Sequence, residues 1–188
     1  MRTITIGEII TDLDKTIPLS WQESYDNAGL LCGNKEEKCT GIYVCFDISE
    51  SVVEKAIANN CNLIVSHHPL VFRAMKRFTS KDNVTTTLLK AITNNIALYS
   101  SHTNLDASNP GVNTILANKL GIRNIRPLCE DTRTNEEGFF GIGGIGELDE
   151  ATELKEYLLH IKKTLNIHNI KYIEGKKAEW REYSIMVS

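Results

Sequence analysis

The sequence lacks several features that would assign a function class quickly. No two of its five cysteines form a Cys-x-x-Cys pair, so a motif for cysteine-bound zinc or disulfide exchange is excluded. A net charge of -3 provides no basic field that would gather nucleic acid. The odd number of scattered thiols indicates a reducing compartment, and no apolar run is long enough to cross a membrane. We therefore expect a cytoplasmic protein with no membrane or nucleic-acid partner.

The length allows one well-buried domain and the start of another. The chain has 188 residues, of which 41% are hydrophobic and 24% are charged, as in ordinary globular proteins. A polar run from Glu130 to Glu137 is the best candidate for a boundary. We expect an α/β metal-binding domain over residues 1–130 and a partial second lobe over residues 131–188.

The first domain reads as strands that alternate with helices. The apolar runs Ile42–Phe46, Asn62–Val65 and Ile96–Ser100 predict strands, the first of them buried on both faces. A helix is predicted between the first two, where Ser51 and Glu54 have capping-box spacing, and another at 84–93. This order indicates a parallel sheet with right-handed βαβ crossovers.

The later part of the chain has weaker signals. A helix is expected at 112–120, where Gly121 suits the left-handed position after a helix. Strands are expected at 138–148 and 170–173 and a helix at 153–165, with no element from residue 178 onward. The fold class is thus α/β, with a parallel-sheet core and the beginning of a second, truncated α/β lobe.

Polar motifs follow two of the predicted strands. Ser66-His67-His68-Pro69 comes directly after one, and the segment from Ser101 to Asp106 comes after the next. Because the carboxyl ends of parallel strands meet at one edge of a sheet, both motifs should lie at that edge, where α/β proteins bind ligands. Pro69 cannot continue a ladder and bends the chain, so both imidazoles can face the edge and diverge toward two ions.

The sequence therefore predicts a metal site with His67, His68 and Asp106 as ligands. Imidazole together with carboxylate suits zinc, manganese, iron or cobalt better than calcium. A lone His-His pair is more typical of a packed loop, and the second motif at the same edge favours the metal interpretation. His102 is either a further ligand or, as we favour, a donor that orients Asp106 or a water. Asp47 is interpreted as a helix cap near this edge.

Other polar residues near these motifs remain without an assigned catalytic role. Ser66 and Ser101 lack the spacing of a nucleophile with its base and are expected to form hydrogen bonds at the strand ends. The basic side chains Arg73, Lys76 and Arg77 could receive an anionic substrate such as a nucleotide phosphate, or could simply belong to a solvated loop. No general acid or nucleophile is identified.

At these motifs the chain resembles the Nif-three-like family, the GTP cyclohydrolase type-two homologues. The resemblance rests on Asp26-Asn-Ala-Gly-Leu30, on the segments 66–72 and 101–106, on Gly111-Val-Asn113 and, more loosely, on 141–148. It implies that His67, His68 and Asp106 bind a dinuclear metal centre, that the assembly is a toroidal homohexamer, and that the reaction is metal-dependent opening of a purine ring in a nucleotide substrate.

The sequence also departs from the family pattern. Members of the family carry a further His/Glu motif near the C-terminus that supplies the remaining ligands, and no His-x-x-x-Glu follows Asp106 here. We therefore expect the N-terminal portion of such a protein, with at most about one divalent ion per chain instead of two. Two functions stay open: a dinuclear-metal-dependent hydrolase, impaired here, and a non-catalytic metal-binding assembly or interaction module.

Overall fold

The chain forms two compact units in the computed structural model, which describes residues 3–128, 137–172 and 179–185. The units are Met1–Leu105 and Asp106–Ser188, and the short helix α4 (Thr103–Asp106) contains the boundary between them. The domain boundary expected after residue 130 lies outside the described residues and stays a prediction.

The first unit is built on a four-stranded sheet. In sheet order its strands are β1 (Gly29–Cys32), β4 (Ala97–Ser100), β3 (Leu63–Ser66) and β2 (Ile42–Cys45). β2, β3 and β4 are parallel, which confirms the predicted core, and β1 adds an antiparallel edge that the sequence pattern did not indicate.

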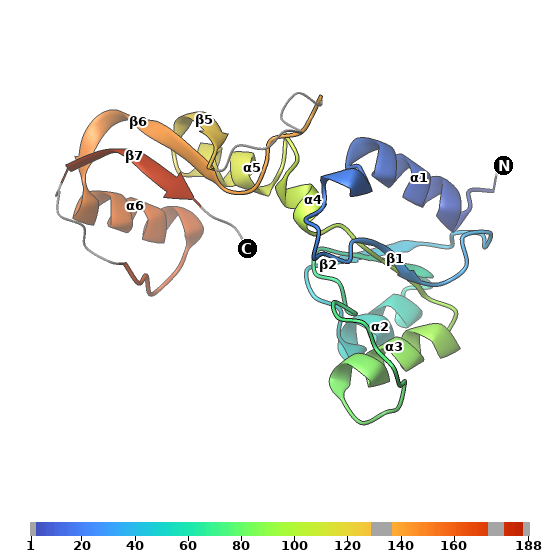
Figure 1. The fold of residues 1–188 in the computed structure, drawn as a ribbon. Helices are drawn as coiled ribbons and strands as arrows, with labels where there is room; N and C mark the ends of the chain where they lie inside the picture. The colour runs from blue at the N-terminus through green and yellow to red at the C-terminus, as the bar shows by residue number, and fades with distance from the viewer. Residues whose placement is uncertain (1–2, 129–136, 173–178, 186–188) are drawn as a thin grey trace. The chain divides into compact units, whose positions relative to one another are not determined.

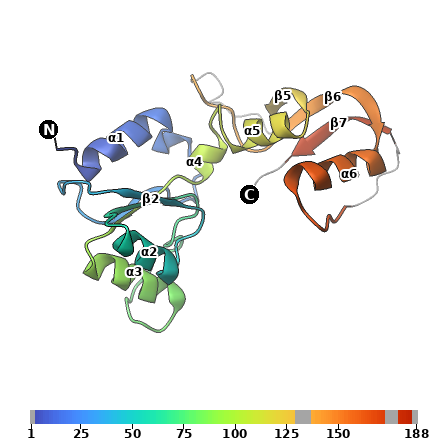
Figure 2. The ribbon, with the colours of Figure 1, turned by 180° about the vertical axis from the view of Figure 1, so that it is seen from behind.

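Helices cover both faces of this sheet. They are α1 (Ile6–Thr16), the 3₁₀ turn η1 (Leu19–Trp21), α2 (Glu50–Ala58) and α3 (Asn83–Thr93). Figure 1 shows α1 on one face and α2 with α3 on the other, and the view from behind in Figure 2 agrees. Two apolar clusters fill these layers, one around Ile64 and Leu98 beneath α2 and α3, the other around Leu63 and Tyr99 beneath α1.

The helix starts are fixed by side-chain caps. Thr5 and Glu8 form a reciprocal capping box at α1, a helix that the sequence analysis did not predict. Ser49, and not Ser51, caps α2 by accepting a hydrogen bond from the Val52 amide. Asp82 caps α3 in the same way. The expected Ser51 and Glu54 capping box was therefore wrong by half a turn.

β2 is an edge strand, which corrects the expectation that it is buried on both faces. Its Tyr43 and Cys45 pack toward α2 and α3, whereas Ile42 and Val44 point away from that layer. The Val44 residue keeps 75% of its surface exposed. Continuous apolar character thus predicted the strand correctly but could not distinguish a covered face from an open one.

The second unit has its own sheet and apolar cluster. Its elements are α5 (Val112–Lys119), β5 (Arg123–Pro127), β6 (Gly144–Glu153), α6 (Leu154–Leu165) and β7 (Glu179–Ile185). The strands form an antiparallel sheet in the order β5-β6-β7. The positive φ of Gly121 after α5 is as expected.

Two sequence-based expectations in this unit were wrong. Residues 170–172 form no strand, and β7 lies in the segment for which no element was expected. The sequence of β7 mixes charged, aromatic and small residues without regular alternation, and it becomes a strand because β6 supplies a hydrogen-bonding partner.

The register of the first sheet brings the two polar motifs together. Ser66 at the end of β3 lies beside Cys45 of β2 and beside Ser100 of β4. The parallel pairing continues one step further, since the Ser101 amide donates to the Ser66 carbonyl over 2.9 Å. His67, His68 and His102 therefore leave the sheet at the same carboxyl edge, as predicted. No helix in the described residues is long and apolar enough to span a bilayer.

Candidate metal centre

Three histidines converge at the carboxyl edge of the first sheet. His67, His68 and His102 each offer one ring nitrogen, and these nitrogens lie within 4.8 Å of one another. The ring centroids are 4.9 Å apart for His67 and His68, 5.3 Å for His67 and His102, and 5.4 Å for His68 and His102. The neighbouring imidazoles of His67 and His68 share one cluster with His102, and their expected divergence toward two ions stays a prediction.

The strand ends hold this arrangement through main-chain and hydroxyl contacts. The amides of His67 and His68 donate to the carbonyls of Cys45 and Phe46, so the backbone stays paired with the last residue of β2 and the residue after it. The Ser66 hydroxyl contacts Ser100 Oγ at 2.8 Å and donates to the His68 carbonyl at 2.8 Å. Ser66 therefore forms the strand-end hydrogen bonds expected of it and fixes the bend before Pro69.

Each histidine has an oxygen beside Nδ1. The Ser101 carbonyl lies 3.0 Å from Nδ1 of His67. A carbonyl only accepts hydrogen bonds, so this nitrogen carries the proton, and in the neutral ring the lone pair lies on Nε2. Carboxylates of Asp47 and Asp26 play the same part for His68 and His102, at 2.7 and 2.8 Å. Oxygen acceptors behind Nδ1 are the usual support of histidines that bind metals.

The partner of His102 is a fully buried carboxylate. The Asp26 side chain is 0% exposed and also accepts hydrogen bonds from the Thr103 amide at 3.0 Å, the Thr103 hydroxyl and the Asn27 amide at 2.7 Å. Burial, the largest single effect, raises the pKa of the Asp26 carboxyl, but these hydrogen bonds together lower that pKa below its ordinary 3.8. Asp26 is therefore ionised at neutral pH.

The carboxylate partner of His68 is exposed, unlike that of His102. Asp47 has a side chain that is 70% exposed, and its carboxylate is directed at His68 Nδ1. The helix cap expected at Asp47 is supplied by Ser49 instead. The residue does lie at the predicted edge of the sheet, where it orients a histidine.

The donor set fits a divalent transition metal. Three imidazoles with room for a further ligand are a recurrent catalytic zinc arrangement, and imidazole also suits iron, cobalt and manganese to differing degrees. Two nitrogens on one tetrahedral zinc lie about 3.4 Å apart when each bond is about 2.1 Å. The three ring nitrogens lie within 4.8 Å of one another, so binding one such ion would require them to move closer together. The sequence analysis held His102 open as a ligand and favoured a supporting role for it, and the role of His102 stays a prediction.

Asp106, the third predicted ligand, begins the second unit. It is buried, it is the last residue of α4, and its carbonyl accepts a hydrogen bond from Asn113 Nδ2 at 2.9 Å. Its role as a metal ligand stays a prediction. Ser101 contributes its carbonyl to His67, while its buried hydroxyl has no hydrogen-bond partner within the described part of the chain.

Two exposed aromatic rings contact the histidines. Phe46 stacks on His67 with a centroid distance of 5.1 Å and meets His68 edge-on at 4.4 Å. Phe72 approaches His102 edge-on at 6.1 Å. The loop that contains Phe72 is tied to the Asp26 segment, because Asn27 Nδ2 donates to the Val71 carbonyl over 2.6 Å.

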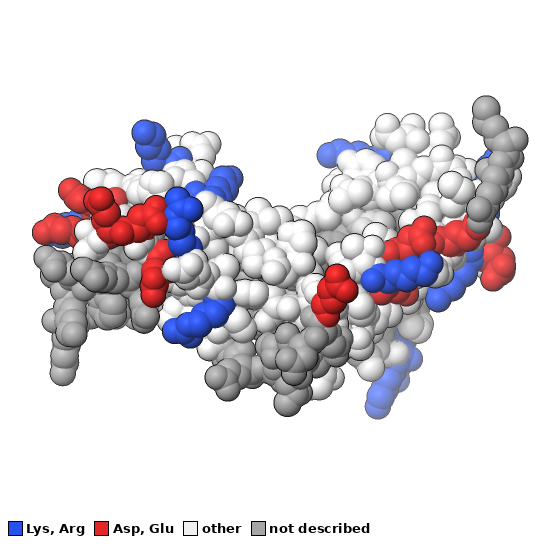
Figure 3. All heavy atoms as spheres, turned by 90° about the horizontal axis from the view of Figure 1, so that it is seen from above, with Lys and Arg blue, Asp and Glu red and all other residues white. Residues whose placement is uncertain are grey.

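Charge on the molecule is mixed. On the face drawn in Figure 3, basic and acidic side chains are interspersed and neither sign forms a continuous field. Arg73, Lys76 and Arg77 are exposed, and none of them pairs with a carboxylate among the residues that the structure describes. These three cations are therefore available to an anion in solution.

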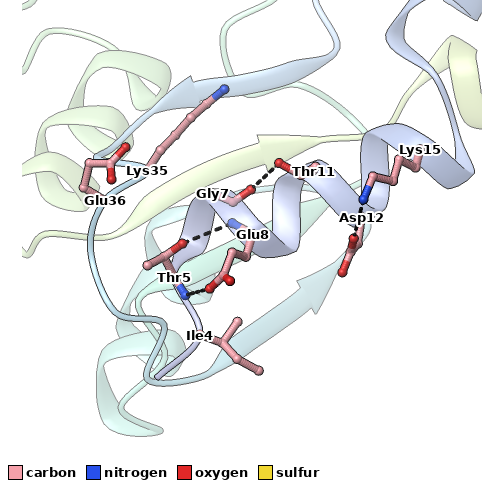
Figure 4. Close-up of a pocket in the computed structure, with 9 residues that line it drawn as sticks. All are labelled: Ile4, Thr5, Gly7, Glu8, Thr11, Asp12, Lys15, Lys35 and Glu36. Atoms are coloured by element: carbon pink, nitrogen blue, oxygen red, sulfur yellow. Dashed lines mark hydrogen bonds and ion pairs between the residues drawn. The ribbon is translucent and has the colours of Figure 1, made fainter. Parts of the chain in front are cut away.

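A groove of about 630 Å³ lies along α1, distant in sequence from the histidine motifs. Its polar residues serve the helix itself. Figure 4 shows Thr5 and Glu8 bonded in the capping box, the Thr11 hydroxyl donating to the Gly7 carbonyl, and Lys15 paired with Asp12 at 3.3 Å. The groove offers no histidine or cysteine, so it is a poorer candidate for a metal than the edge of the sheet.

Comparison with known proteins agrees with the resemblance noted in the sequence. The family model described as Duf34/NIF3 (NGG1p interacting factor 3) matches residues 4–186. The chain belongs to this family. A Clostridium acetobutylicum relative named GTP cyclohydrolase 1 type 2 homolog is 29% identical over 184 residues, which are 98% of this chain and 68% of the relative. A Staphylococcus epidermidis relative of the same name is 42% identical over 161 residues, 86% of this chain.

The chain spans only 41% of the length of that Staphylococcus epidermidis relative. Among solved structures, a hypothetical protein of Staphylococcus aureus superposes with a TM-score of 0.85 at 26% identity, covering 98% of this chain and 72% of the other. A Bacillus cereus protein related to NIF3 gives 0.87 at 20% identity, with 99% and 77% covered, and at that identity it supports the fold alone. The Duf34/NIF3 fold is therefore shared over nearly the whole chain.

Proposed function

We propose that this Duf34/NIF3 chain is a metal-dependent hydrolase whose metal site includes His67, His68 and His102. The observation that carries the proposal is the convergence of these three rings with an oxygen acceptor behind each Nδ1. A divalent ion held there supplies Lewis-acid activation of water. By family resemblance, Asp106 adds a carboxylate ligand.

Oxygen atoms of the protein fix the orientation of the three imidazoles. The Ser101 carbonyl, Asp47 and Asp26 direct the three imidazoles, so little rotamer freedom is lost on ligation. Phe46 and Phe72 border the histidines with apolar rings, which exclude water from one side and offer planar faces to a substrate.

We propose a purine nucleotide as substrate and, as the reaction, hydrolysis of its imidazole ring by two waters: the first cleaves one bond of C8 to nitrogen and opens the ring, and the second cleaves the other and releases C8 as formate. Aromatic rings beside the histidines suit a planar base, and Arg73, Lys76 and Arg77 follow Phe72 closely enough in sequence to receive a phosphate. The names of the relatives point the same way, since both are called GTP cyclohydrolase 1 type 2 homologs.

Formate release from GTP tests this function. The full chain is assayed with zinc, manganese or iron added and with the metal removed by a chelator. We expect release only with metal, loss of release in His67→Ala, and a higher KM in Arg73→Glu, with Lys15→Glu in the α1 groove as the matched charge control. A chain that is loaded with metal and releases no formate would refute the cyclohydrolase.

A non-catalytic metal-binding module is the second candidate. It is favoured by one specific observation: among the described residues, the group of possible ligands at this edge consists of three histidines and contains no carboxylate. Under this alternative, metal binding changes assembly or partner binding and not substrate turnover. Metal-dependent light scattering without formate release would support it.

A further inference from the structure

Asp26, the partner of His102, is the first residue of the motif Asp26-Asn-Ala-Gly-Leu30. The residue lies in the segment before β1, far from His102 in sequence. Its side chain is nevertheless 0% exposed and faces both His102 and Thr103. Among the described residues Asp26 pairs with no lysine or arginine, and a buried carboxylate of this kind is costly unless hydrogen bonds compensate for it.

The two carboxylate oxygens of Asp26 have separate tasks. Oδ1 accepts from His102 Nδ1 at 2.8 Å and from the Asn27 amide at 2.7 Å. Oδ2 accepts from the amide of Thr103 at 3.0 Å and from its hydroxyl, at the start of α4. One side chain thus fixes the proton position on His102 and anchors the turn that follows it.

We propose that Asp26 is the positioning residue that sets the metal affinity of this site, by holding His102 in the tautomer whose Nε2 can bind a metal. Asp47 is a much weaker support for His68. The inference rests on the metal centre of the proposed function and adds a role for the Asp26 motif.

The isosteric substitution Asp26→Asn tests whether Asp26 sets the tautomer of His102. The amide has one oxygen and one NH₂ where the carboxylate has two acceptors. If the NH₂ faces Thr103, it meets the backbone amide of a buried residue, which then has no acceptor. If it faces His102, the other donor on that side is the amide of exposed Asn27, which water can satisfy. The second orientation costs less, and it forces His102 Nδ1 to accept, which moves the proton to Nε2 and blocks ligation.

Asp47→Asn is the matched control because the same chemistry has a different outcome there. Asp47 is 70% exposed, and its one hydrogen bond among the described residues goes to His68. Its amide can turn the oxygen toward His68 Nδ1 while water solvates the NH₂, so the tautomer of His68 is kept.

The test combines two measurements on the full chain. Zinc affinity is determined by competition with a chelating dye for the wild type, Asp26→Asn and Asp47→Asn. We expect a loss of about 10- to 100-fold in Asp26→Asn, the range of such outer partners, and a loss below about tenfold in Asp47→Asn. Long-range ¹H–¹⁵N NMR of the metal-free proteins should show His102 protonated at Nδ1 in the wild type and at Nε2 in Asp26→Asn.

Equal zinc affinity in the wild type and Asp26→Asn, or an equally large loss in Asp47→Asn, would overturn the proposal. So would a wild-type His102 protonated at Nε2, a result that needs no variant to fold. A chain that ranks the three affinities as expected but releases no formate from GTP would remove the cyclohydrolase and leave the role of Asp26 intact. Formate release from GTP together with an unchanged zinc affinity in Asp26→Asn would support the cyclohydrolase and overturn the role of Asp26.

Discussion

The imidazole rings of His67 and His102 lie with their centroids 5.3 Å apart, although the residues follow different strands. Parallel pairing of β3 with β4 explains the approach, because Ser66 and Ser100 are register partners and each motif begins just beyond them. The sheet therefore brings the cluster together before any ion is bound, so removing a ligand should change metal content more than it changes the fold.

His67→Ala and His102→Ala should each lower the zinc content of the purified chain while the far-ultraviolet circular dichroism stays unchanged. Neither ring fills the apolar clusters of the first unit. Elemental analysis measures the zinc, and His160→Ala, an exposed histidine of α6 outside the cluster, is the control. Unchanged zinc in both cluster variants would contradict the assignment.

Asp106→Asn tests the ligand that was predicted from sequence and lies at the start of the second unit. The substitution keeps the shape of a buried side chain and removes its charge. If Asp106 ligates as the family resemblance implies, zinc affinity should fall by about 10-fold or more. Retention of wild-type affinity would restrict the site to the histidines.

The sequence predicted the core of this site because its signals are local. His67 and His68 lie directly behind an apolar strand, and the second motif follows the next one, so the position of both at one edge follows from βαβ topology alone. Asp26 was not predicted as the partner of His102. It lies 76 residues away, and no spacing rule connects two residues that meet only after β1 pairs with β4.

The edges of the fold were also hard to predict. β2 has a continuous apolar sequence and is nevertheless exposed at Val44, since burial depends on which neighbours cover the strand. β7 has little apolar patterning and forms because β6 is available to pair with it. In both cases tertiary context overrides local preference.

Tyr99→Phe should lower the free energy of unfolding by about 1.5–3 kcal/mol at neutral pH, as expected for a hydrogen bond to a charged group. The buried Tyr99 hydroxyl donates to Asp14 Oδ1 over 2.7 Å and ties α1 to the sheet. Chemical denaturation measures the difference. An unchanged free energy would show that water replaces this bond without cost.

The environment of Tyr99 also leads us to expect that the stability of the fold depends on pH. Burial first, then the hydrogen bond to Asp14 and the charge of Asp14, raise the Tyr99 pKa well above its ordinary value of 10.0. The contribution of the Tyr99 hydroxyl to the free energy of unfolding is therefore fully present below pH 10. It is lost as the pH rises further, because Tyr99 ionises at a lower pH in the unfolded chain than in the folded one. Wild-type stability should fall more steeply above pH 10 than that of Tyr99→Phe, and parallel curves would contradict the shift.

Alanine substitutions at two glycines with positive φ distinguish the cost of backbone strain from the cost of steric crowding. Gly33 has a φ of +116°, and a Cβ there would lie 2.5 Å from Ala97 Cβ, whereas Gly121 has a φ of +76° with nothing within 4 Å. Gly33→Ala should destabilise by about 2–4 kcal/mol, the sum of left-handed strain and overpacking, and Gly121→Ala by about 1 kcal/mol. Thermal unfolding compares them, and equal losses would contradict the crowding at Gly33.

Self-association is expected from the family resemblance and from the open face of β2, where Ile42 and Val44 are exposed. Light scattering of the full chain at micromolar concentration should give a mass above 21.1 kDa, the mass of one chain. Val44→Lys should shift the mass toward one chain if this face is the contact. A monodisperse monomer in the wild type would rule out the expected homo-oligomer.

The most direct test of the histidine metal centre is zinc stoichiometry and X-ray absorption on the loaded full chain. We predict about one zinc per chain, bound by nitrogen and oxygen ligands at about 2.0–2.2 Å, with the imidazole scattering lost in the triple variant His67→Ala, His68→Ala, His102→Ala. Absence of bound zinc, sulfur ligands at about 2.3 Å, or a spectrum that the triple variant leaves unchanged would contradict the site.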